Sequence, residues 1–355
     1  MKILVYSHVF PPSVGGTEEV VRLLVEEFCR AGHEIVVATR TLGEGIAREP
    51  YRVVRRPTFI DLLRLGRESE VAVLIGVSLR AAPALLLLRR PFVISHHVYL
   101  ERWPPQRVHH SLPSLIALKL KRWISSRAQN VYTSRGFMRA DQGSGIVIRN
   151  PFDIKLFRPA LEKDRDIVFV GRMIPEKGCS DLVDALKILK AQKIEPTVTL
   201  IGDGPERESL EQRVKSAGLQ DTVTFTGVLT GELLARMVAR HRISVVPSRW
   251  PEPFGIVALE AIASGCVVVG TDGGGLPEAI GPCGMIVRPN EPSAIAAAMK
   301  MLLNDRREYD RYSRAGSRFT AYHAPYLVAQ DYLTVLGRIA RGPSEARPME
   351  SNSIC

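Results

Sequence analysis

The segment PSRWPEPFGIVALEAIASG, residues 247–265, places two acids, Glu252 and Glu260, eight positions apart. Because Glu252 precedes a proline, its backbone is driven out of helical geometry and the acid should lie in a loop. Proline suits the first position of a helix, so we expect a helix through residues 254–263, with Glu260 about two turns inside it. The two carboxylates would then be roughly 10 to 12 Å apart along the axis.

A helix that begins between two acids leaves its first amide groups free for a ligand. Such a site suits an elongated molecule with hydroxyl groups at both ends and negative charge in the middle, and a nucleotide sugar is one. Glu252 would bind the sugar and Glu260 the ribose. Alternatively, Glu252 only complements the helix dipole and Glu260 is a surface acid. The amides concerned are those of Phe254, Gly255 and Ile256.

Two further loops follow expected strands and could bind phosphate. GRMIPEKG brings Arg172 and Lys177 together after the strand DIVFVG, and two cations on one short loop suit a diphosphate. VGGTEE places Gly15 and Gly16 before a helix for which we expect Thr17 as the N-cap, so that the backbone can approach an anion. Either loop could instead be an ordinary solvated turn.

The elements that must position these loops follow one pattern along the chain. Both halves alternate short apolar runs with amphipathic stretches, which predicts βα units around parallel sheets; Ser180 is expected to cap the first helix of the second half. The 355 residues suit two doubly wound domains of about 150 residues each, facing a central cleft. We assign residues 1–160 to an acceptor-binding domain and 161–325 to a nucleotide-sugar-binding domain. Residues 326–341 should form a helix that packs back toward the first domain, and 342–355 a disordered tail.

The net charge of +11 lies entirely in the first half, where residues 1–160 hold 24 Lys and Arg against 13 Asp and Glu. Such a field favours an anionic membrane surface or a phosphorylated partner. Nucleic acid is less expected, because the second half has no basic excess and no binding motif. The segment SLPSLIALKLKRWISSRAQ is typical of an interfacial amphipathic helix, although it could equally pack on its own sheet. Its cations are Lys119, Lys121, Arg122 and Arg127.

Two features argue against secretion and a metal site. The first apolar stretch, KILVYS, is much shorter than a signal-peptide core, so we expect a cytoplasmic protein that can also meet the inner face of the membrane. The five cysteines are scattered without metal-ligand spacing. A D-x-D sequence at Asp164 and Asp166 lies at the amino end of an expected strand, so we expect no metal there. His109 and His110 lie in an irregular segment and are not expected to be ligands.

Taken together, these motifs resemble the retaining glycosyltransferases of family 4, which have the GT-B fold. The resemblance rests on G-G in the first βα loop, G-R-x4-K-G, G-D-G-P, the E-x7-E segment and G-G-G-L-P-E, and it is dense from residue 167 to residue 290. It implies that Glu252 contacts the transferred sugar and Glu260 the nucleotide ribose. Arg172 and Lys177 would bind the diphosphate, and Gly15 and Gly16 would close on it.

The resemblance also implies a histidine after the strand PFVIS, which falls at His97, although His96 beside it leaves the assignment open. Glu278 should brace a loop near the donor. The implied activity moves a hexose from a UDP- or GDP-linked sugar to a hydroxyl of a glycan or lipid-linked acceptor, in cell-surface polysaccharide or glycolipid synthesis, without a metal or other cofactor. The alternatives are a catalytically silent nucleotide-sugar-binding protein and a basic nucleic-acid-binding protein.

Overall fold

The computed structural model describes residues 1–43, 50–101 and 111–341, which divide into two compact units. The first unit contains residues 1–43, 50–100, 111–132 and 326–341, and the second contains Glu101 and residues 133–325. Residues 133–160 therefore fold with the second unit, and the last helix folds with the first. The tail that the sequence predicts to be disordered lies outside the described residues.

The first unit is built on a parallel sheet of order β3-β2-β1-β4-β5-β6. β1 pairs with both β2 and β4, so the sheet grows first in one direction and then in the other, as doubly wound sheets do. The strands are β1 (Lys2–Ser7), β2 (Glu34–Thr39), β3 (Arg52–Arg55), β4 (Val71–Ile75), β5 (Phe92–His96) and β6 (Gln129–Tyr132), while the short strand β7 (Ile146–Val147) lies among the residues of the second unit.

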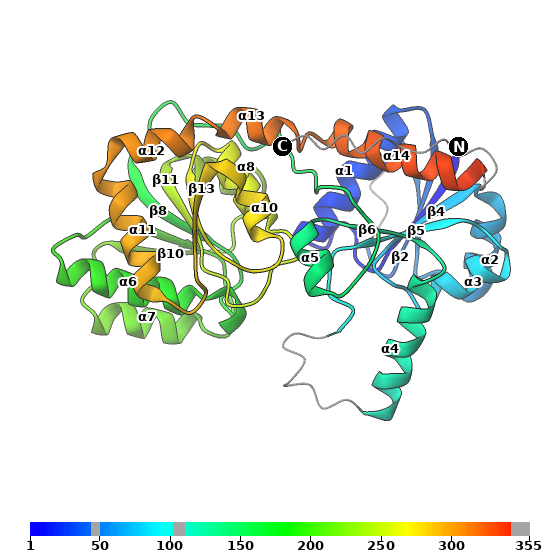
Figure 1. Cartoon of the computed structure of the whole chain (residues 1–355), viewed down its shortest axis with the longest axis horizontal. Coiled ribbons are helices and arrows are strands. Elements are labelled where there is room, and N and C mark those ends of the chain that lie inside the picture. The colour runs from blue at the N-terminus through cyan, green and yellow to red at the C-terminus, as the bar shows by residue number, and fades with distance from the viewer. Residues whose placement is uncertain (44–49, 102–110, 342–355) are drawn as a thin grey trace. The chain divides into compact units, whose positions relative to one another are not determined.

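Helices cover both faces of this sheet, because alternate residues of a strand point to opposite sides. Leu4 and Tyr6 of β1 belong to one apolar cluster with Leu62 and Leu65, while Ile3 and Val5 are buried on the other face. The helices of the unit are α1 (Gly16–Arg30), α2 (Phe59–Glu68), α3 (Ala81–Leu87), α4 (Leu112–Ser125) and α14 (Pro325–Arg341). Figure 1 shows α4 extending away from the rest of the unit.

The second unit repeats the plan with a parallel sheet of order β10-β9-β8-β11-β12-β13. Its strands are β8 (Arg165–Val170), β9 (Val198–Ile201), β10 (Val223–Gly227), β11 (His241–Val246), β12 (Val267–Thr271) and β13 (Gly284–Val287). Its helices are α5 (Arg135–Ala140), α6 (Cys179–Ala191), α7 (Arg207–Ser216), α8 (Gly231–Ala239), α9 (Ile256–Ala263), α10 (Leu276–Ile280), α11 (Pro292–Asn304), α12 (Arg306–Ser313) and α13 (Gly316–Ala321), with short 3-10 turns at Pro175–Lys177 and Gly281–Cys283. The expected pair of doubly wound sheets is thus confirmed.

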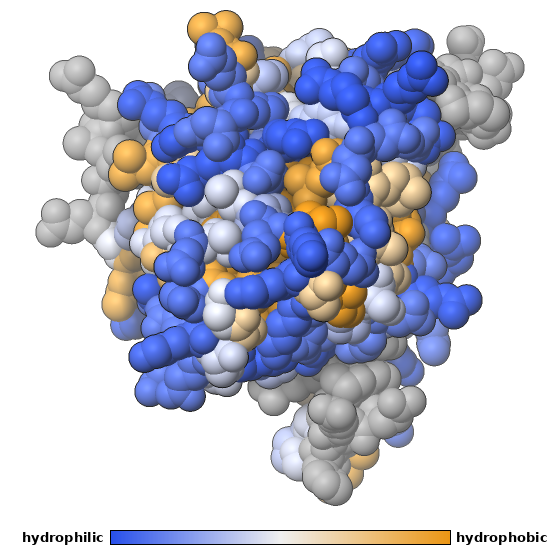
Figure 2. All heavy atoms as spheres, turned by 90° about the vertical axis from the view of Figure 1, so that its left-hand side faces the viewer, coloured by the Kyte–Doolittle hydropathy of each residue, from blue (hydrophilic) through white to orange (hydrophobic). Residues whose placement is uncertain are grey.

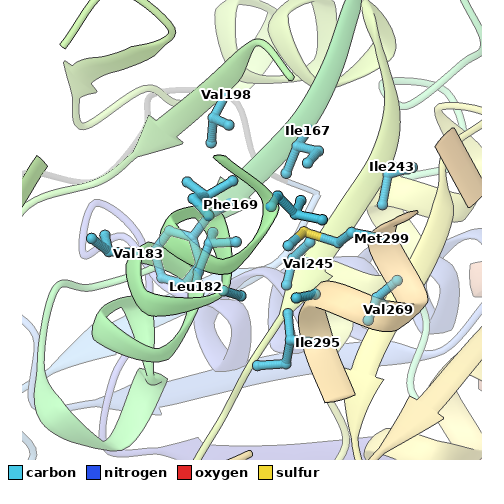
Figure 3. Packing of buried hydrophobic residues seen from close by; sticks show 14 of the residues in the cluster. Ile167, Phe169, Leu182, Val183, Val198, Ile243, Val245, Val269, Ile295 and Met299 are labelled. Carbon is cyan, nitrogen blue, oxygen red and sulfur yellow. The ribbon is translucent and has the colours of Figure 1, made fainter. Parts of the chain in front are cut away.

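The core of the second unit is apolar on both sides of its sheet. Ile167 and Phe169 of β8 pack with Leu182 of α6 and Met299 of α11, as Figure 3 shows. Val168, between them in sequence, belongs to the cluster on the opposite face. Each fully buried side chain of this size stabilises the fold by about 1.5–3 kcal/mol. These layers hold the strands, and hence the loops at their carboxyl ends, in fixed positions.

Three helices begin at a different residue from the one the sequence predicts. The N-cap of α1 is Gly15 rather than Thr17, and the N-cap of α6 is Gly178 rather than Ser180. α9 begins at Ile256 after Gly255, so the prediction of Pro253 as a first helical residue is wrong. Gly178 and Gly255 have φ angles of 65° and 101°, a region where glycine has no steric penalty. A backbone contact described below imposes the conformation of Gly178.

The described helices include none that is long and apolar enough to cross a membrane. Figure 2 shows one face of the molecule, the one at the left-hand side of Figure 1, where the second unit lies. Hydrophilic side chains cover most of this face, and apolar side chains occur in small groups between them.

Candidate functional site

The loops that follow β8 and β11 lie at the point where the second sheet reverses its direction of growth. The two strands are neighbours in the sheet, although β9 and β10 lie between them in the chain. Doubly wound sheets bind ligands at such a point, outside the carboxyl ends of the strands. Arg172 and Lys177 follow β8, and Glu252 follows β11. The topology therefore brings all three residues to one edge of the sheet.

Lys177 and Glu252 form an ion pair at this edge. Lys177 Nζ lies 2.6 Å from Glu252 Oε1, and the Ser248 hydroxyl donates to the same oxygen at 2.6 Å. Glu252 is 6% exposed, so its carboxylate depends on these partners. The Lys177 side chain is 26% exposed, and its ammonium group lies 5.8 Å from the ring centroid of Trp250. The pair thus holds a fixed anion beside a cation that solvent can still reach.

Backbone contact between the two loops fixes the position of the Lys177–Glu252 pair. A Cβ added to Gly178 would lie 1.9 Å from the carbonyl oxygen of Pro247, so only glycine permits this approach. The amide of Arg249 donates to the carbonyl of Glu176 at 2.8 Å. The guanidinium of Arg249 also donates to Asp181 at 2.8 Å and to Ser180 Oγ at 2.9 Å. The Ser180 hydroxyl therefore binds Arg249 instead of capping a helix.

A third loop, between β12 and α10, supports the backbone of Glu252. Glu252 and Gly274 form a parallel bridge, and the amide of Gly275 donates to the carbonyl of Glu252 at 2.7 Å. Gly274 has a φ of +61°, and a Cβ there would lie 2.1 Å from the same carbonyl oxygen. The motif G-G-G-L-P-E is recognisable in the sequence, but this role of its glycines was not predicted. The run of three glycines was the available signal of close backbone approach.

The segment that follows β6 contacts the loop that carries Glu252, and the sequence did not predict this contact. The hydroxyls of Thr133 and Ser134 both donate to the carbonyl of Pro253 at 3.1 Å. Glu278 accepts the amides of Arg135 at 3.0 Å and of the next residue at 2.6 Å. Its carboxylate thus caps the amino end of α5. Glu278 does brace a loop, and it does so across two segments that are more than 130 positions apart in the chain.

The start of α9 changes the geometry expected for the two acids. Only the residues from Ile256 onward are helical. The helical rise per residue therefore does not apply between Glu252 and Ile256, and the separation expected for the two carboxylates does not follow from it. Within the described part of the chain, the amides of Gly255 and Ile256 have no hydrogen-bond acceptor. The Phe254 side chain is buried at 3% exposure and packs against the ring of His323 at 5.6 Å. Phe254 is therefore an anchor of the loop through its side chain.

Arg172 and Glu260 differ in their exposure. The Arg172 side chain is exposed, and it forms no ion pair with any of the residues that the structure describes. Glu260 lies on α9 and is half-buried. Arg172, on the same loop as Lys177, therefore has an exposed guanidinium, as a site for an anion requires.

In the first unit, the Gly15–Gly16 loop carries an acid at the amino end of α1. Glu18 is 9% exposed and accepts the Ser13 hydroxyl at 2.9 Å. A Cβ on Gly15 would lie 2.5 Å from Glu18 Oε2, so this carboxylate folds back against the loop. A side-chain anion thus occupies part of the space where the sequence analysis expected only free amides and the positive end of the helix dipole.

The two histidines at the end of β5 have different partners. His96 is fully buried, stacks on Tyr132 with ring centroids 4.3 Å apart, and contacts Asn130 through Nε2 at 2.9 Å. His97 Nε2 lies 2.8 Å from Ser95 Oγ, which in turn lies 2.6 Å from the hydroxyl of Tyr332 on α14. Burial lowers the pKa of His97 to about 4, so its imidazole is neutral at pH 7. His109 and His110 lie outside the described residues.

Both acids of the D-x-D sequence, at the amino end of β8, are bound by other residues of the chain. Asp164 is held by Arg240, and this hydrogen-bonded partner lowers the pKa of the carboxyl to about 2. Asp166 accepts the amide and the hydroxyl of Thr197 at 2.9 and 3.0 Å. In the described parts of the chain, no group of three or more His, Cys, Asp or Glu residues could hold a metal ion.

The chain is similar in sequence to several known proteins. Residues 153–319 match the family model described as Glycosyl transferases group 1. A glycogen synthase of Mycobacterium tuberculosis is 32% identical over 209 residues, which are 57% of this chain and half of that relative. A GDP-mannose-dependent alpha-(1-6)-phosphatidylinositol monomannoside mannosyltransferase of Mycolicibacterium smegmatis is 29% identical over 88% of this chain and 92% of the relative.

Solved structures show the same fold over almost the whole chain. The Anabaena protein HepE, crystallised with UDP-glucose, has a TM-score of 0.78 at 21% identity and covers 95% of this chain and 99% of its own. A sucrose-phosphate synthase from Thermosynechococcus elongatus has a TM-score of 0.75 at 24% identity, covering 94% and 98%. The chain therefore has the GT-B fold, and the loops around Lys177 and Glu252 lie within the segment that matches the family model of the group 1 glycosyl transferases.

Proposed function

We propose that this chain transfers a hexose from a UDP- or GDP-linked sugar to a hydroxyl group of a glycan or lipid-linked acceptor, with retention of configuration and without a metal ion. The observation that carries the proposal is the Lys177–Glu252 ion pair, held by Ser248 at the reversal point of the second sheet. It is supported by the match of residues 153–319 and by relatives whose names describe glycosyl transfer.

In the proposed reaction, the bond between the anomeric carbon and the diphosphate oxygen breaks, and the leaving diphosphate takes the electron pair. The acceptor hydroxyl attacks the same face of the sugar and gives its proton to the departing phosphate oxygen. Arg172 and Lys177 stabilise the charge that develops on the diphosphate. An ammonium group has three N–H donors, so Lys177 can keep its bond to Glu252 while it contacts a phosphate oxygen.

The remaining residues position the donor. The fixed carboxylate of Glu252 accepts hydrogen bonds from sugar hydroxyls, and Glu260 accepts those of the ribose. The free amides of Gly255 and Ile256 at the start of α9 suit the phosphates. Roles for Gly15, Gly16 and His97 of the first unit stay predictions that rest on the family resemblance.

Calorimetric titration with UDP-, GDP- and ADP-sugars tests the proposal. We expect one nucleotide class to bind, and Glu260→Ala to weaken its binding at least 10-fold through the loss of charge-assisted hydrogen bonds, about 1.4 kcal/mol. Glu232→Ala is the matched control, because Glu232 is a helix acid with a 73% exposed side chain that pairs with Arg236.

Three outcomes would contradict parts of this proposal. Equal affinity in Glu260→Ala and wild type would remove the ribose role. Tight binding without turnover of any acceptor or of the donor itself would indicate a nucleotide-sugar-binding protein instead of an enzyme. Loss of turnover on addition of a chelator would contradict transfer without a metal.

A further inference from the structure

A cavity of about 900 Å³ opens at the amino end of the second sheet. Three of its residues mark this place, because Lys163 lies just before β8, Arg242 is the second residue of β11, and Gly265 lies just before β12. Most of the remaining wall comes from residues 152–161 and from α12 and α13, which are orange in Figure 1. The ion pair of the candidate site follows the carboxyl ends of β8 and β11. Since these strands are parallel, the cavity lies at the opposite edge of the sheet and is separate from that site.

Two arginines of this cavity are held around one tyrosine ring. The guanidinium carbons of Arg242 and Arg306 lie 5.1 and 5.6 Å from the ring centroid of Tyr309. Tyr309 is 5% exposed, and its hydroxyl donates to the carbonyls of Arg242 at 3.3 Å and of Gly265 at 3.4 Å. Because the ring is anchored at its hydroxyl, the two cations beside it stay close together and can contact one ligand.

A lysine in the wall adds a fixed positive charge. Lys163 Nζ donates at 3.0, 2.7 and 3.0 Å to the carbonyl oxygens of Ala239, His241 and Ser264. Three acceptors require three N–H donors, so the amine is protonated here, although burial lowers its pKa. No carboxylate among the described residues pairs with it. The ammonium group therefore contributes its charge to the cavity, while its hydrogen-bond donors are already engaged.

The charges around the cavity leave an excess of two. Its lining contains four cations: Arg158, Lys163, Arg242 and Arg306. One acid of the lining, Asp310, accepts from Arg306 at 2.9 Å, and Asp166 lies 3.8 Å from Arg242. Arg158 is exposed and forms no hydrogen bond or ion pair with any residue in the described ranges. Two positive charges remain, which suits a dianionic phosphate better than a single carboxylate.

Hydroxyl groups and apolar side chains complete the lining. Ser313 and Ser317 lie four positions apart, and their hydroxyls form no hydrogen bond within the part of the chain that the structure describes. Phe157 and Ile262 supply an apolar wall. Small-molecule sites combine such walls with a few polar groups, and their volumes extend to about 1,000 Å³. The cavity therefore suits a compact molecule that carries hydroxyl groups as well as a phosphate.

We propose that this cavity binds the phosphate monoester of a small polyhydroxy compound. Arg158, Arg242 and Arg306 contact the phosphate oxygens, and the charge of Lys163 strengthens their attraction. The hydroxyls of Ser313 and Ser317 bind those of the ligand. This inference goes beyond the proposed reaction and does not depend on it, because no residue of the Lys177–Glu252 site takes part.

Calorimetric titration of the full chain with sorbitol 6-phosphate, sorbitol and inorganic phosphate tests this inference. We expect sorbitol 6-phosphate to bind at least 10-fold more tightly than inorganic phosphate, and sorbitol not to bind. Arg158→Gln/Arg306→Gln should weaken the binding of sorbitol 6-phosphate about 30-fold or more, because two charge-assisted contacts are lost. Both side chains are exposed, so the variant should fold, and thermal melting checks this.

Arg236→Gln is the matched control for the change at Arg306. The two side chains are 77% and 76% exposed, and each pairs with an acid four positions away on its helix. The control should bind sorbitol 6-phosphate as the wild type does. Arg172→Ala should also leave this binding unchanged, which separates the cavity from the proposed donor site.

Hydrogen exchange locates the bound molecule. We expect sorbitol 6-phosphate to protect residues 152–163 and 306–321. Protection of residues 172–177 and 252–256 instead would overturn the inference, and so would equal affinity in Arg158→Gln/Arg306→Gln and wild type. A complete lack of binding would also contradict it. Inorganic phosphate that binds as tightly as sorbitol 6-phosphate would refute the polyhydroxy part of the ligand.

Discussion

The two units share a strand order, yet the loops at their carboxyl ends are built differently. In the second unit, a Cβ on Gly178, Gly202, Gly204 or Gly274 would lie between 1.9 and 2.4 Å from a carbonyl oxygen of a neighbouring loop. In the first unit, a Cβ on Gly15 would meet only the end of the Glu18 side chain, and one on Gly76 would meet nothing within 4 Å.

The difference indicates how each unit can bind a ligand. Interlocked backbones fix the loops of the second unit before a ligand arrives, so binding requires little reorganisation. The loops after β1 and β4 of the first unit have room around their glycines and are held mainly by side chains. The same strand order can thus support rigid loops in one unit and adaptable loops in the other.

The largest effect that we expect is from Arg172→Ala, which removes a cation that the proposed reaction needs. The kcat should fall about 100-fold, because the charge on the departing diphosphate loses one of its two stabilising groups. Steady-state kinetics with the donor identified by calorimetry measures this. Arg135→Ala on α5 is the control, and a change below threefold in Arg172→Ala would deny the residue this role.

A pair of glycine substitutions tests the comparison directly. Gly274→Ala should weaken nucleotide-sugar binding about 30-fold, since overpacking against the Glu252 carbonyl costs about 2 kcal/mol. Gly15→Ala should change that binding less than threefold, because its extended backbone accepts a side chain and the Glu18 carboxylate can move aside. Calorimetry and thermal melting compare the two variants. Equal losses in both would remove the distinction between the units.

A smaller effect is expected from Ser248→Ala. Ser248 positions Glu252 and is itself held by Thr271, whose hydroxyl donates to its carbonyl at 2.7 Å. Loss of the hydroxyl should lower kcat about 10-fold, or about 1.4 kcal/mol, and leave KM for the donor nearly unchanged. Ser248→Thr should restore most of the rate. If the alanine variant instead raised KM alone, Ser248 would serve donor binding and not the orientation of Glu252.

The smallest effect that we expect from a single residue is that of a buried histidine on the pH dependence of stability. Both units contain such histidines. Burial lowers the pKa of His97 in the first unit, and of His241 and His323 in the second, to about 4. The unfolded chain protonates them near 6.5, so between these values it binds more protons than the folded chain. Stability present above pH 6.5 is therefore lost as the pH falls toward 4.

We expect each of these histidines to lower the free energy of unfolding by about 1 kcal/mol between pH 7 and pH 5.5. Urea unfolding at the two pH values measures the sum. If the two units unfold separately, both should lose stability, because burial also lowers the pKa of His96 in the first unit. A stability that does not change over this range would contradict the assignment of these histidines as neutral in the fold.

The order of strands and the loops that carry the site follow from local signals in the sequence. The run DIVFVG predicts β8, the run ISVVPS predicts β11, and parallel pairing then brings the loops that follow them together. Arg172, Lys177 and Glu252 could be found in this way, because each lies in a loop that follows a strand. Proximity at a sheet edge is a consequence of topology, which short-range patterns predict well.

The contacts of these residues could not be predicted, because they join distant segments. The pairing of Lys177 with Glu252 spans 75 positions, and Glu278 caps a helix more than 130 positions before it. The starts of α6 and α9 were predicted wrongly for the same reason. Thr, Ser and Pro are good local N-terminal signals, but glycine is required at Gly178 by the carbonyl of Pro247 and is favoured at Gly255 by its φ of 101°.

The contacts of Thr133 and Ser134 have a practical consequence for dividing the chain. A fragment that began at residue 161, where the linker composition changes, would lack both hydroxyls that donate to the Pro253 carbonyl. It would also leave Glu278 without the amides of α5 and would remove Phe152 and Phe157 from the apolar core. An excised second unit should therefore start near residue 133, so that the residues that support the loop of Glu252 are expressed together with this acid.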